Sequence, residues 1–134
     1  MSGVDYSSDR TILRYAPDGL ETLEIPSTVK VIYGSSSTDY AFQKCVSSFK
    51  SFSFQSGSQL QTILPYSFYS CKKITSVDFS SCSNLQTIGD YAFYGCNSIS
   101  SLILPSNLNE IGIYAFYGIK ISSLSLPSSI EKKQ

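Results

Sequence analysis

The chain has no histidine and no tryptophan among its 134 residues, and only 15% of its residues are charged. Because histidine is the commonest general base and metal ligand near neutral pH, its absence excludes Ser-His-Asp and Cys-His catalytic sites. Ten Lys and Arg balance ten Asp and Glu, and no three basic residues run together, which argues against nucleic-acid or anionic-membrane binding. The acidic residues lie mostly singly or near the chain ends, so we expect no convergent carboxylates and no enzymatic activity.

Long apolar segments are also missing. The longest apolar stretches are a few residues, as at Leu102–Leu104, whereas a membrane-spanning helix needs about 18 or more. The first ten residues do not have the apolar core and basic flank of a secretory signal, and no Asn-x-Ser/Thr sequon occurs. We therefore expect no membrane insertion and an intracellular, cytoplasmic protein, or a cell-surface protein if the sequence is a fragment of a longer chain.

A repeated pattern of apolar residues accounts for most of the sequence. The spacing apolar-x-x-apolar-x-apolar begins at Leu20 and recurs after steps of 29, 25, 25 and 22 residues. An apolar-x-x-apolar pair and then an aromatic block follow the first four copies. The first segments are 20–25, 49–54, 74–79, 99–104 and 121–126, the pairs are 29–32, 60–63, 85–88 and 108–111, and the blocks are 40–42, 66–68, 91–93 and 114–116. Such regular self-similarity predicts a solenoid.

Each part of the repeat has a structural interpretation. Alternation in the first segment predicts a short strand with Leu, Val, Ile and Phe facing inward, and Pro26, Pro105 and Pro127 would end strand pairing. The second pair predicts another short strand, and the aromatic block predicts a single turn of α- or 3-10 helix. One coil cannot close a core, so neighbouring coils must cover it. We expect one mainly β domain over residues 1–134, with about four and a half repeats over 20–130 and a charged tail at 131–134.

The stretch Asn84–Gly95, with its Ile-Gly turn and Tyr-Ala-Phe block followed by Cys96, resembles the BspA-type leucine-rich repeat, and so does Ile99–Phe116. The resemblance covers about residues 20–130 and implies a parallel-stranded leucine-rich repeat fold. It also implies protein binding, and several members of that family are surface adhesins. We therefore expect a non-catalytic protein-interaction module, scaffold or adhesin, with a carbohydrate-binding surface protein as the alternative.

Three segments depart from the regular repeat. Residues 10–16 and 20–25 flank a Pro-Asp-Gly turn, which predicts a hairpin that caps the first coil within residues 1–25. Residues 34–38 are a Gly-, Ser- and Thr-rich insertion, which predicts a flexible loop. No polar capping helix follows the fifth segment, so we expect an uncapped C-terminal coil, covered by a second copy or by another protein.

The four cysteines are expected to be free thiols. Cys45, Cys71 and Cys96 each follow a block Phe by three residues, and Ile119 replaces them in the last coil. Wide spacing does not fit the Cys-x-x-Cys pairs of zinc sites, and the apolar replacement favours core filling over a disulfide or a metal. Cys82 lies outside this column, in a longer loop, and is expected to be partly exposed. We expect no metal and no cofactor.

Three surfaces are candidates for binding a partner: the tyrosines that flank each Ala-Phe pair, the outward face of the first segments, and the last coil. The tyrosines should form ladders that either dock a protein or a carbohydrate, or only cover the corners of the coils. The outward face is rich in Ser and Thr, and its side chains either contact a partner or pair across strands. The candidate contact residues are Ser53, Ser76, Asp78, Ser101, Ile103, Ser123, Tyr66, Tyr91, Tyr94, Tyr114 and Tyr117.

Overall fold

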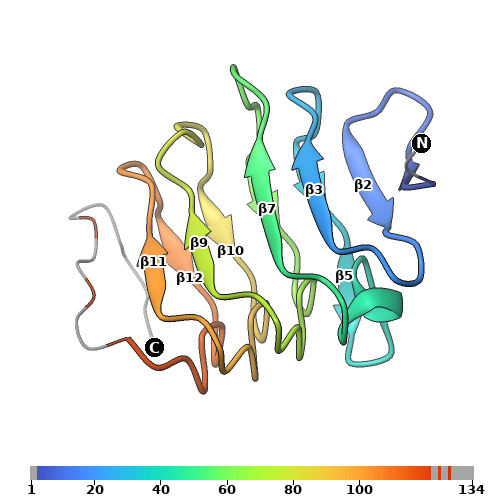
Figure 1. The fold of residues 1–134 in the computed structure, drawn as a ribbon. Coiled ribbons are helices and arrows are strands. Elements are labelled where there is room, and N and C mark those ends of the chain that lie inside the picture. Colours follow the sequence, from blue (N-terminus) through green and yellow to red (C-terminus); the bar gives the residue numbers. More distant parts are fainter. Residues whose placement is uncertain (1–2, 122–123, 125–126, 128–134) are drawn as a thin grey trace.

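A computed structural model describes residues 3–121, 124 and 127 of the chain. The chain winds into a solenoid of stacked coils, and a typical coil has one strand at the front of the view and a second strand behind it (Figure 1). The elements are β1 (Asp5–Tyr6), β2 (Ile12–Tyr15), β3 (Thr22–Ile25), β4 (Val31–Ile32), β5 (Gly34–Ser36), β6 (Asp39–Tyr40), η1 (Gln43–Cys45), β7 (Ser51–Phe54), β8 (Thr62–Ile63), β9 (Ser76–Asp78), β10 (Thr87–Ile88), β11 (Ser101–Ile103) and β12 (Glu110–Ile111). The fold is the mainly β solenoid that the repeat predicts, with the parallel strands that the resemblance to leucine-rich repeats implies.

The second strands of the coils build the continuous sheet of the molecule. Its order is β1-β2-β4-β8-β10-β12, and every pair after β1-β2 is parallel. The register places one apolar residue of each coil in a single row: Leu13, Ile32, Ile63, Ile88 and Ile111. All five side chains are buried. The apolar-x-x-apolar pairs of the sequence therefore form one wall of the core.

The first strands of the coils form two separate pairs, β3-β7 and β9-β11, rather than one sheet. Within each pair the register is the one that the repeat predicts, with Thr22 opposite Ser51 and Ser76 opposite Ser101. Between the pairs, the ring of Phe79 lies 6.2 Å from that of Phe52 and 5.9 Å from that of Phe54. β7 and β9 are thus joined by ring packing in the core, although they are not paired as strands.

A ladder of phenylalanines fills the centre of the solenoid. Phe42, Phe68, Phe93 and Phe116, one from each aromatic block, stack with ring centroids 4.4, 4.7 and 5.2 Å apart and interplanar angles of 16°, 8° and 8°. The first three rings are fully buried, and Phe116 is half-buried. Because each ring packs on the coils before and after it, the core is built between coils rather than within one coil.

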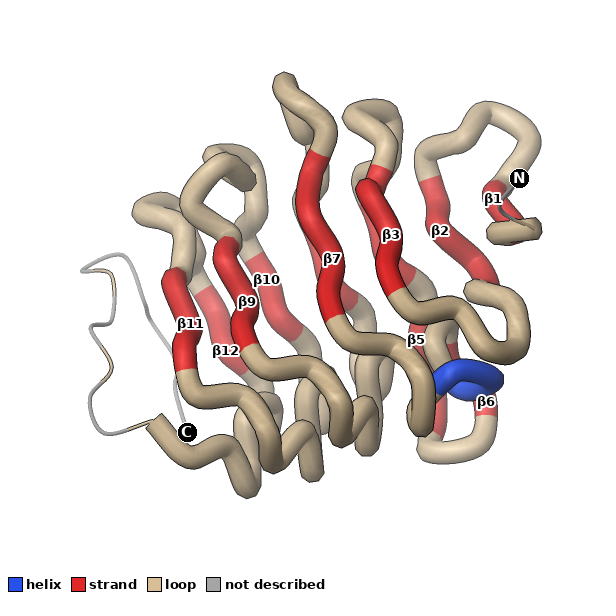
Figure 2. The backbone as a smooth tube through the Cα atoms, viewed as in Figure 1, coloured by secondary structure: helices blue, strands red, loops and turns tan. Residues whose placement is uncertain are grey.

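The aromatic blocks form the corners at one end of the coils. The predicted helical turn is present as η1 in the first coil, the blue segment of Figure 2, and as hydrogen-bonded turns in later coils, where the N–H of Tyr94 donates to the carbonyl oxygen of Tyr91 at 3.2 Å. Hydrogen bonds between neighbouring coils hold each corner. The N–H groups of Tyr91, Phe93 and Gly95 donate to the carbonyl oxygens of Ile113, Ala115 and Tyr117 at 2.9, 2.7 and 2.9 Å. The corners of successive coils are thereby kept in register.

The N-terminal cap is a hairpin, but its strands are not the predicted ones. β1 pairs antiparallel with β2, whereas residues 22–25 form β3 in the other layer and pair with β7. The prediction that residues 10–16 pair with 20–25 was wrong, because the Pro-Asp-Gly turn is a coil corner that carries the chain from one layer to the other. β2 occupies the second-strand row of the repeat, so the coil pattern begins before Leu20.

The insertion at residues 34–38 adopts regular structure, so the prediction of a loop there was wrong. β5 and β6 form a short antiparallel hairpin in which Gly34 lies opposite Tyr40. The carboxylate of Asp39 anchors it, because it accepts hydrogen bonds from the hydroxyls of Tyr15 at 2.7 Å and Tyr33 at 2.6 Å. Tyr15 belongs to β2, and Tyr33 directly follows β4. Both tyrosines lie outside the insertion, so its composition could not reveal these hydrogen bonds.

Most of the predicted C-terminal features lie outside the described residues. These are the predicted strand over 121–126 apart from Ile121 and Leu124, candidate residue Ser123, and the tail at 131–134. The predicted uncapped coil depends on the same residues.

Candidate binding surfaces

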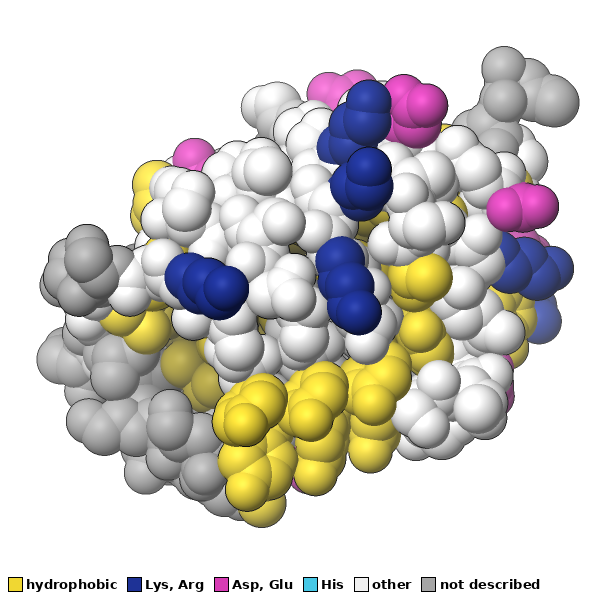
Figure 3. Space-filling view, turned by 60° about the horizontal axis from the view of Figure 1, so that its bottom comes forward, with side chains coloured by type: hydrophobic (Ala, Val, Ile, Leu, Met, Phe, Trp, Pro, Cys, Tyr) yellow, Lys and Arg dark blue, Asp and Glu magenta, His cyan; other side chains and the backbone are white. Residues whose placement is uncertain are grey.

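Tyrosines form two ladders along one corner of the solenoid. Rings stack at 5.0 Å between Tyr66 and Tyr91, and at 5.3 and 5.1 Å between Tyr69, Tyr94 and Tyr117, with interplanar angles of 2°, 10° and 11°. Tyr114 continues the first ladder at 5.5 Å from Tyr91 with a tilt of 59°. We call these six residues the tyrosine flank. A row of hydrophobic side chains is visible along the lower edge of Figure 3.

The two ladders also touch one another, so the flank is a single packed surface. Ring centroids lie 5.2 Å apart between Tyr66 and Tyr69 and 5.3 Å apart between Tyr114 and Tyr117. Tyr40 was expected to continue the ladder, but it does not. It is only 5% exposed and packs edge-on against Tyr69. It lies in β6 of the insertion hairpin, and burial raises the pKa of its phenol to about 12.

Stacking determines which part of each tyrosine meets solvent. Where a ring lies face to face with its neighbours, it can present only its edge and its hydroxyl. Exposure increases along the flank to 46% for Tyr114 and 57% for Tyr117. A depression of about 200 Å³ at this end of the flank is lined by Tyr91, Tyr94, Tyr114 and Tyr117. The structure thus brings five predicted contact residues together and adds Tyr69.

The sheet-face candidates do not form one continuous surface. Ser53 belongs to the β3-β7 pair, whereas Ser76, Asp78, Ser101 and Ile103 belong to the β9-β11 pair. Asp78 lies opposite Ile103, which is 46% exposed. Hydrogen bonds from the Ser80 side chain and N–H lower the pKa of Asp78, so this carboxylate stabilises its own turn.

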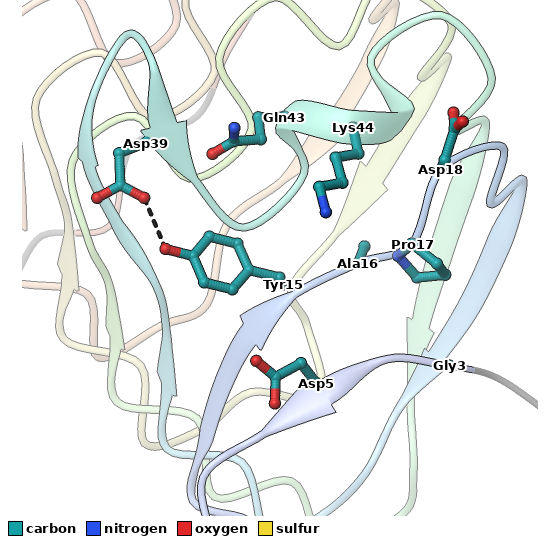
Figure 4. Close-up of a pocket in the computed structure, with 9 residues that line it drawn as sticks. All are labelled: Gly3, Asp5, Tyr15, Ala16, Pro17, Asp18, Asp39, Gln43 and Lys44. Atoms are coloured by element: carbon teal, nitrogen blue, oxygen red, sulfur yellow. Dashed lines mark hydrogen bonds between the residues drawn. The ribbon is translucent and has the colours of Figure 1, made fainter.

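A cavity of about 500 Å³ at the N-terminal cap was missed by the sequence analysis. Figure 4 shows its lining residues, which are Gly3, Asp5, Tyr15, Ala16, Pro17, Asp18, Asp39, Gln43 and Lys44. Hydrogen bonds from Tyr33 and then Tyr15 lower the pKa of Asp39, and the bond to Asp39 is the main cause that raises the pKa of Tyr15 to about 12. These residues come from separate elements. The pairing of Asp5 with Tyr15, the Tyr15–Asp39 hydrogen bond and the bond from the Ala16 N–H to the Ala41 carbonyl oxygen bring them together.

All four cysteines are free and buried, as expected for three of them. Burial raises the pKa of the Cys45 and Cys96 thiols to about 12. The expectation that Cys82 is partly exposed was wrong. It follows Phe79 by three residues, and its N–H donates to the Phe79 carbonyl oxygen at 2.9 Å, which is the same inward turn that the column cysteines make. The Phe-x-x-Cys spacing was a signal for this burial. Among the described residues, no group of His, Cys, Asp and Glu could hold a metal ion.

The comparison of sequence families agrees with this geometry. Residues 14–134 match the BspA-type leucine-rich repeat region in six copies. The chain belongs to this family. The match begins within β2, in keeping with a repeat that starts before Leu20. No curated protein sequence matches the chain. Leucine-rich repeat families of this kind supply interaction or surface repeat modules, which is the broad class of this protein.

Three solved structures are similar to the chain. A leucine-rich cell surface protein from Faecalibacterium prausnitzii is 22% identical, with a TM-score of 0.47 over 90% of this chain and 38% of that one. A leucine-rich repeat protein from Eubacterium ventriosum is 24% identical, with a TM-score of 0.36 over 95% of this chain and 45% of that one. A leucine-rich repeat protein from T. pallidum is 18% identical, with a TM-score of 0.33 over 87% of this chain and 86% of that one.

The chain therefore spans less than half the length of the first two similar structures. A separate finding concerns membranes: within the residues that the structure describes, no helix has the length and apolar character needed to cross a bilayer.

Proposed function

We propose that this chain is a non-catalytic protein-interaction module and that it docks its partner on the tyrosine flank. The observation that carries the proposal is the pair of stacked, partly exposed ladders. Tyrosine supplies a large contact area with a polar end, and it is enriched at protein interfaces. Stacking already restricts these rings, so binding a partner would cost little additional side-chain entropy.

The tyrosine flank is a better docking surface than the sheet face. Interface energy usually comes from a few large side chains, mainly Trp, Tyr and Arg, whereas Ser contributes little. The predicted contacts on the sheet face are three described serines, Asp78 and Ile103. The missing strand pairing between β7 and β9 divides them. Ile103 offers exposed apolar area there, but its neighbour across the pair is a carboxylate.

Carbohydrate binding is the second candidate. Sugars usually stack on the open face of an aromatic ring, and the faces within the ladders are covered by the next ring. The exposed rings of Tyr114 and Tyr117 are the observation that favours this alternative. A protein partner fits the flank better because it can use ring edges and hydroxyls along the whole ladder.

The first experiment removes the rings from the end of the flank. The double variant Tyr94→Ala/Tyr117→Ala should weaken binding of a purified partner, identified by crosslinking, by about 30-fold or more, as for two interface residues that each contribute at least about 1 kcal/mol. Ser76→Ala/Ser101→Ala on the sheet face serves as the matched control and should bind normally. Circular dichroism checks that both variants fold. Normal partner binding by the folded tyrosine variant would refute the proposed docking surface.

A glycan array tests the carbohydrate alternative directly. Glycan binding that is lost in Tyr114→Ala/Tyr117→Ala but not in the serine control would favour that alternative.

Whether the module acts as an adhesin or as a scaffold depends on where the complete gene product resides. As an adhesin, the module would be displayed at the cell surface within a longer chain. As a scaffold, it would stay inside the cell. Protease treatment of intact cells that express the tagged complete product distinguishes the two, because only the surface form would be cleaved.

A further inference from the structure

Lysines lie beside the tyrosine flank on one side. Lys72 and Lys73 follow Tyr69 by three and four residues, Lys120 follows Tyr117 by three, and all three lysines are exposed. Three to four residues of chain span at most about 11–14 Å, which places the backbone of these lysines within that distance of the second ladder. In Figure 3, Lys or Arg side chains lie near the hydrophobic row, and no acidic side chain is seen between them.

These three lysines are not neutralised within the described residues. The ion pairs there join Arg14 to Asp5 and Lys50 to Glu21, so Lys72, Lys73 and Lys120 have no carboxylate partner. Asp90 directly precedes Tyr91 in the chain, and its Oδ1 accepts the N–H of Ile113 at 2.8 Å. The whole chain has a formal net charge of 0. Lys72, Lys73 and Lys120 are therefore a local excess of positive charge on a chain that is neutral as a whole.

The stacked tyrosines favour anions as well. An aromatic ring carries negative charge density on its faces and positive charge density at its edge. The ladder covers the faces that would attract a cation and leaves edges toward solvent. The phenol hydroxyls can also donate charge-assisted hydrogen bonds to a carboxylate. Ring edges, hydroxyls and lysines therefore all favour a negatively charged partner.

We infer that the segment docked on the tyrosine flank is an acidic stretch of polypeptide, with carboxylates that meet Lys72, Lys73 and Lys120 and apolar or aromatic side chains that pack on the rings. This inference rests on the proposed docking function and specifies the partner's chemistry. A single-stranded nucleic acid fits less well, because its bases bind by stacking on open aromatic faces and its phosphates need more than three lysines to bind tightly.

The test uses fluorescence anisotropy with a soluble synthetic peptide in which Glu alternates with Tyr and Ala. The same peptide with Gln in place of Glu should bind about tenfold or more weakly, and raising the salt concentration should weaken the acidic peptide further. Lys72→Ser/Lys120→Ser should weaken acidic-peptide binding about fivefold, from two exposed charge pairs. Arg14→Ser/Lys30→Ser removes the same charge from the region of β2 and β4 and should leave binding unchanged.

Three results would overturn the inference. They are equal binding of the Glu and Gln peptides, unchanged binding by the folded lysine variant, and tighter binding of a sulfated oligosaccharide of the same charge. Failure of this inference can be told apart from failure of the docking proposal. If Tyr94→Ala/Tyr117→Ala loses the crosslinked partner while the lysine variant keeps it, the docking surface stands and the acidic partner is wrong.

Discussion

Phe93 provides the sharpest test of how the solenoid is held together. Its ring is fully buried, stacks between Phe68 at 4.7 Å and Phe116 at 5.2 Å, and meets Phe79 edge-on at 6.2 Å. The ring therefore contacts the coil before it, the coil after it and the opposite layer. Phe93→Ala would open a cavity between coils, where the neighbouring backbone is fixed by corner hydrogen bonds and cannot collapse into the space.

The expected loss for Phe93→Ala is about 3–5 kcal/mol in the free energy of unfolding, the range for a fully buried Phe reduced to Ala. Proteins of this size are stable by about 5–15 kcal/mol, so one substitution should remove a large fraction of the total. With a urea dependence of about 2 kcal/mol per M, the unfolding midpoint should fall by about 2 M. Urea titration followed by far-ultraviolet circular dichroism measures this shift.

Phe116→Ala is the matched control for Phe93→Ala. Phe116 is half-buried at the edge of the core, and within the part of the chain that the structure describes its ring stacks on Phe93 alone, so its loss should cost only about 1–2 kcal/mol. A loss below about 1 kcal/mol for Phe93→Ala, or equal losses for the two variants, would show that stacking between coils does not hold the core together.

Further predictions concern the backbone, the thiols and alkaline pH. A Cβ at Gly89 would lie 2.6 Å from the backbone nitrogen of Pro65, so Gly89→Ala should cost about 2–3 kcal/mol in urea titrations. Gly57→Ala adds strain at φ +81° but meets no atom within 4 Å, and should cost about 1 kcal/mol; a larger loss at Gly57 would contradict this. All four thiols should resist a thiol-specific reagent at pH 8 until urea unfolds the chain, and fast reaction of the folded protein would refute their burial. Burial raises the pKa of Tyr40 from 10.0 and of Cys45 from 9.0 to about 12. The unfolded chain therefore loses these protons at lower pH than the folded chain does, so stability is constant below about pH 9 and decreases above it. The urea midpoint should fall as pH rises from 9 to 12, and a constant midpoint would contradict this.

The repeat made much of the fold predictable. Residues at equivalent repeat positions occupy equivalent places in adjacent coils, so aligning Ile63, Ile88 and Ile111 in the sequence already gives the strand register. The same logic predicted the tyrosine ladders, because Tyr91 and Tyr94 flank an Ala and a Phe that must face inward. Periodicity was sufficient here because each coil meets only its neighbours.

Features that depend on particular contacts were not predictable in this way. The missing pairing between β7 and β9 is one such feature. β7, β9 and β11 begin at the same 25-residue step, at Ser51, Ser76 and Ser101, so the spacing of apolar residues does not encode it. The cap was mispredicted because Pro-Asp-Gly suits a hairpin turn and a coil corner equally. Asp39 lines the N-terminal cavity from the hairpin that the insertion forms, whereas the composition of the insertion indicated a loop.

The backbone conformation of the tyrosine flank allows a test of whether its rings dock a partner or only cover the corners of the coils. Tyr66, Tyr91 and Tyr114 begin their corners at φ of 68°, 61° and 57°, a left-handed conformation that Asn adopts at lower cost than a bulky residue. Such strain is commonly kept where a side chain has a function. Tyr91→Asn should therefore change stability by less than about 1 kcal/mol, since relief of strain offsets lost stacking, while weakening partner binding at least about tenfold. A loss above about 2 kcal/mol in urea titration, with binding unchanged in the fraction that stays folded, would mean that these rings only cover the corners of the coils.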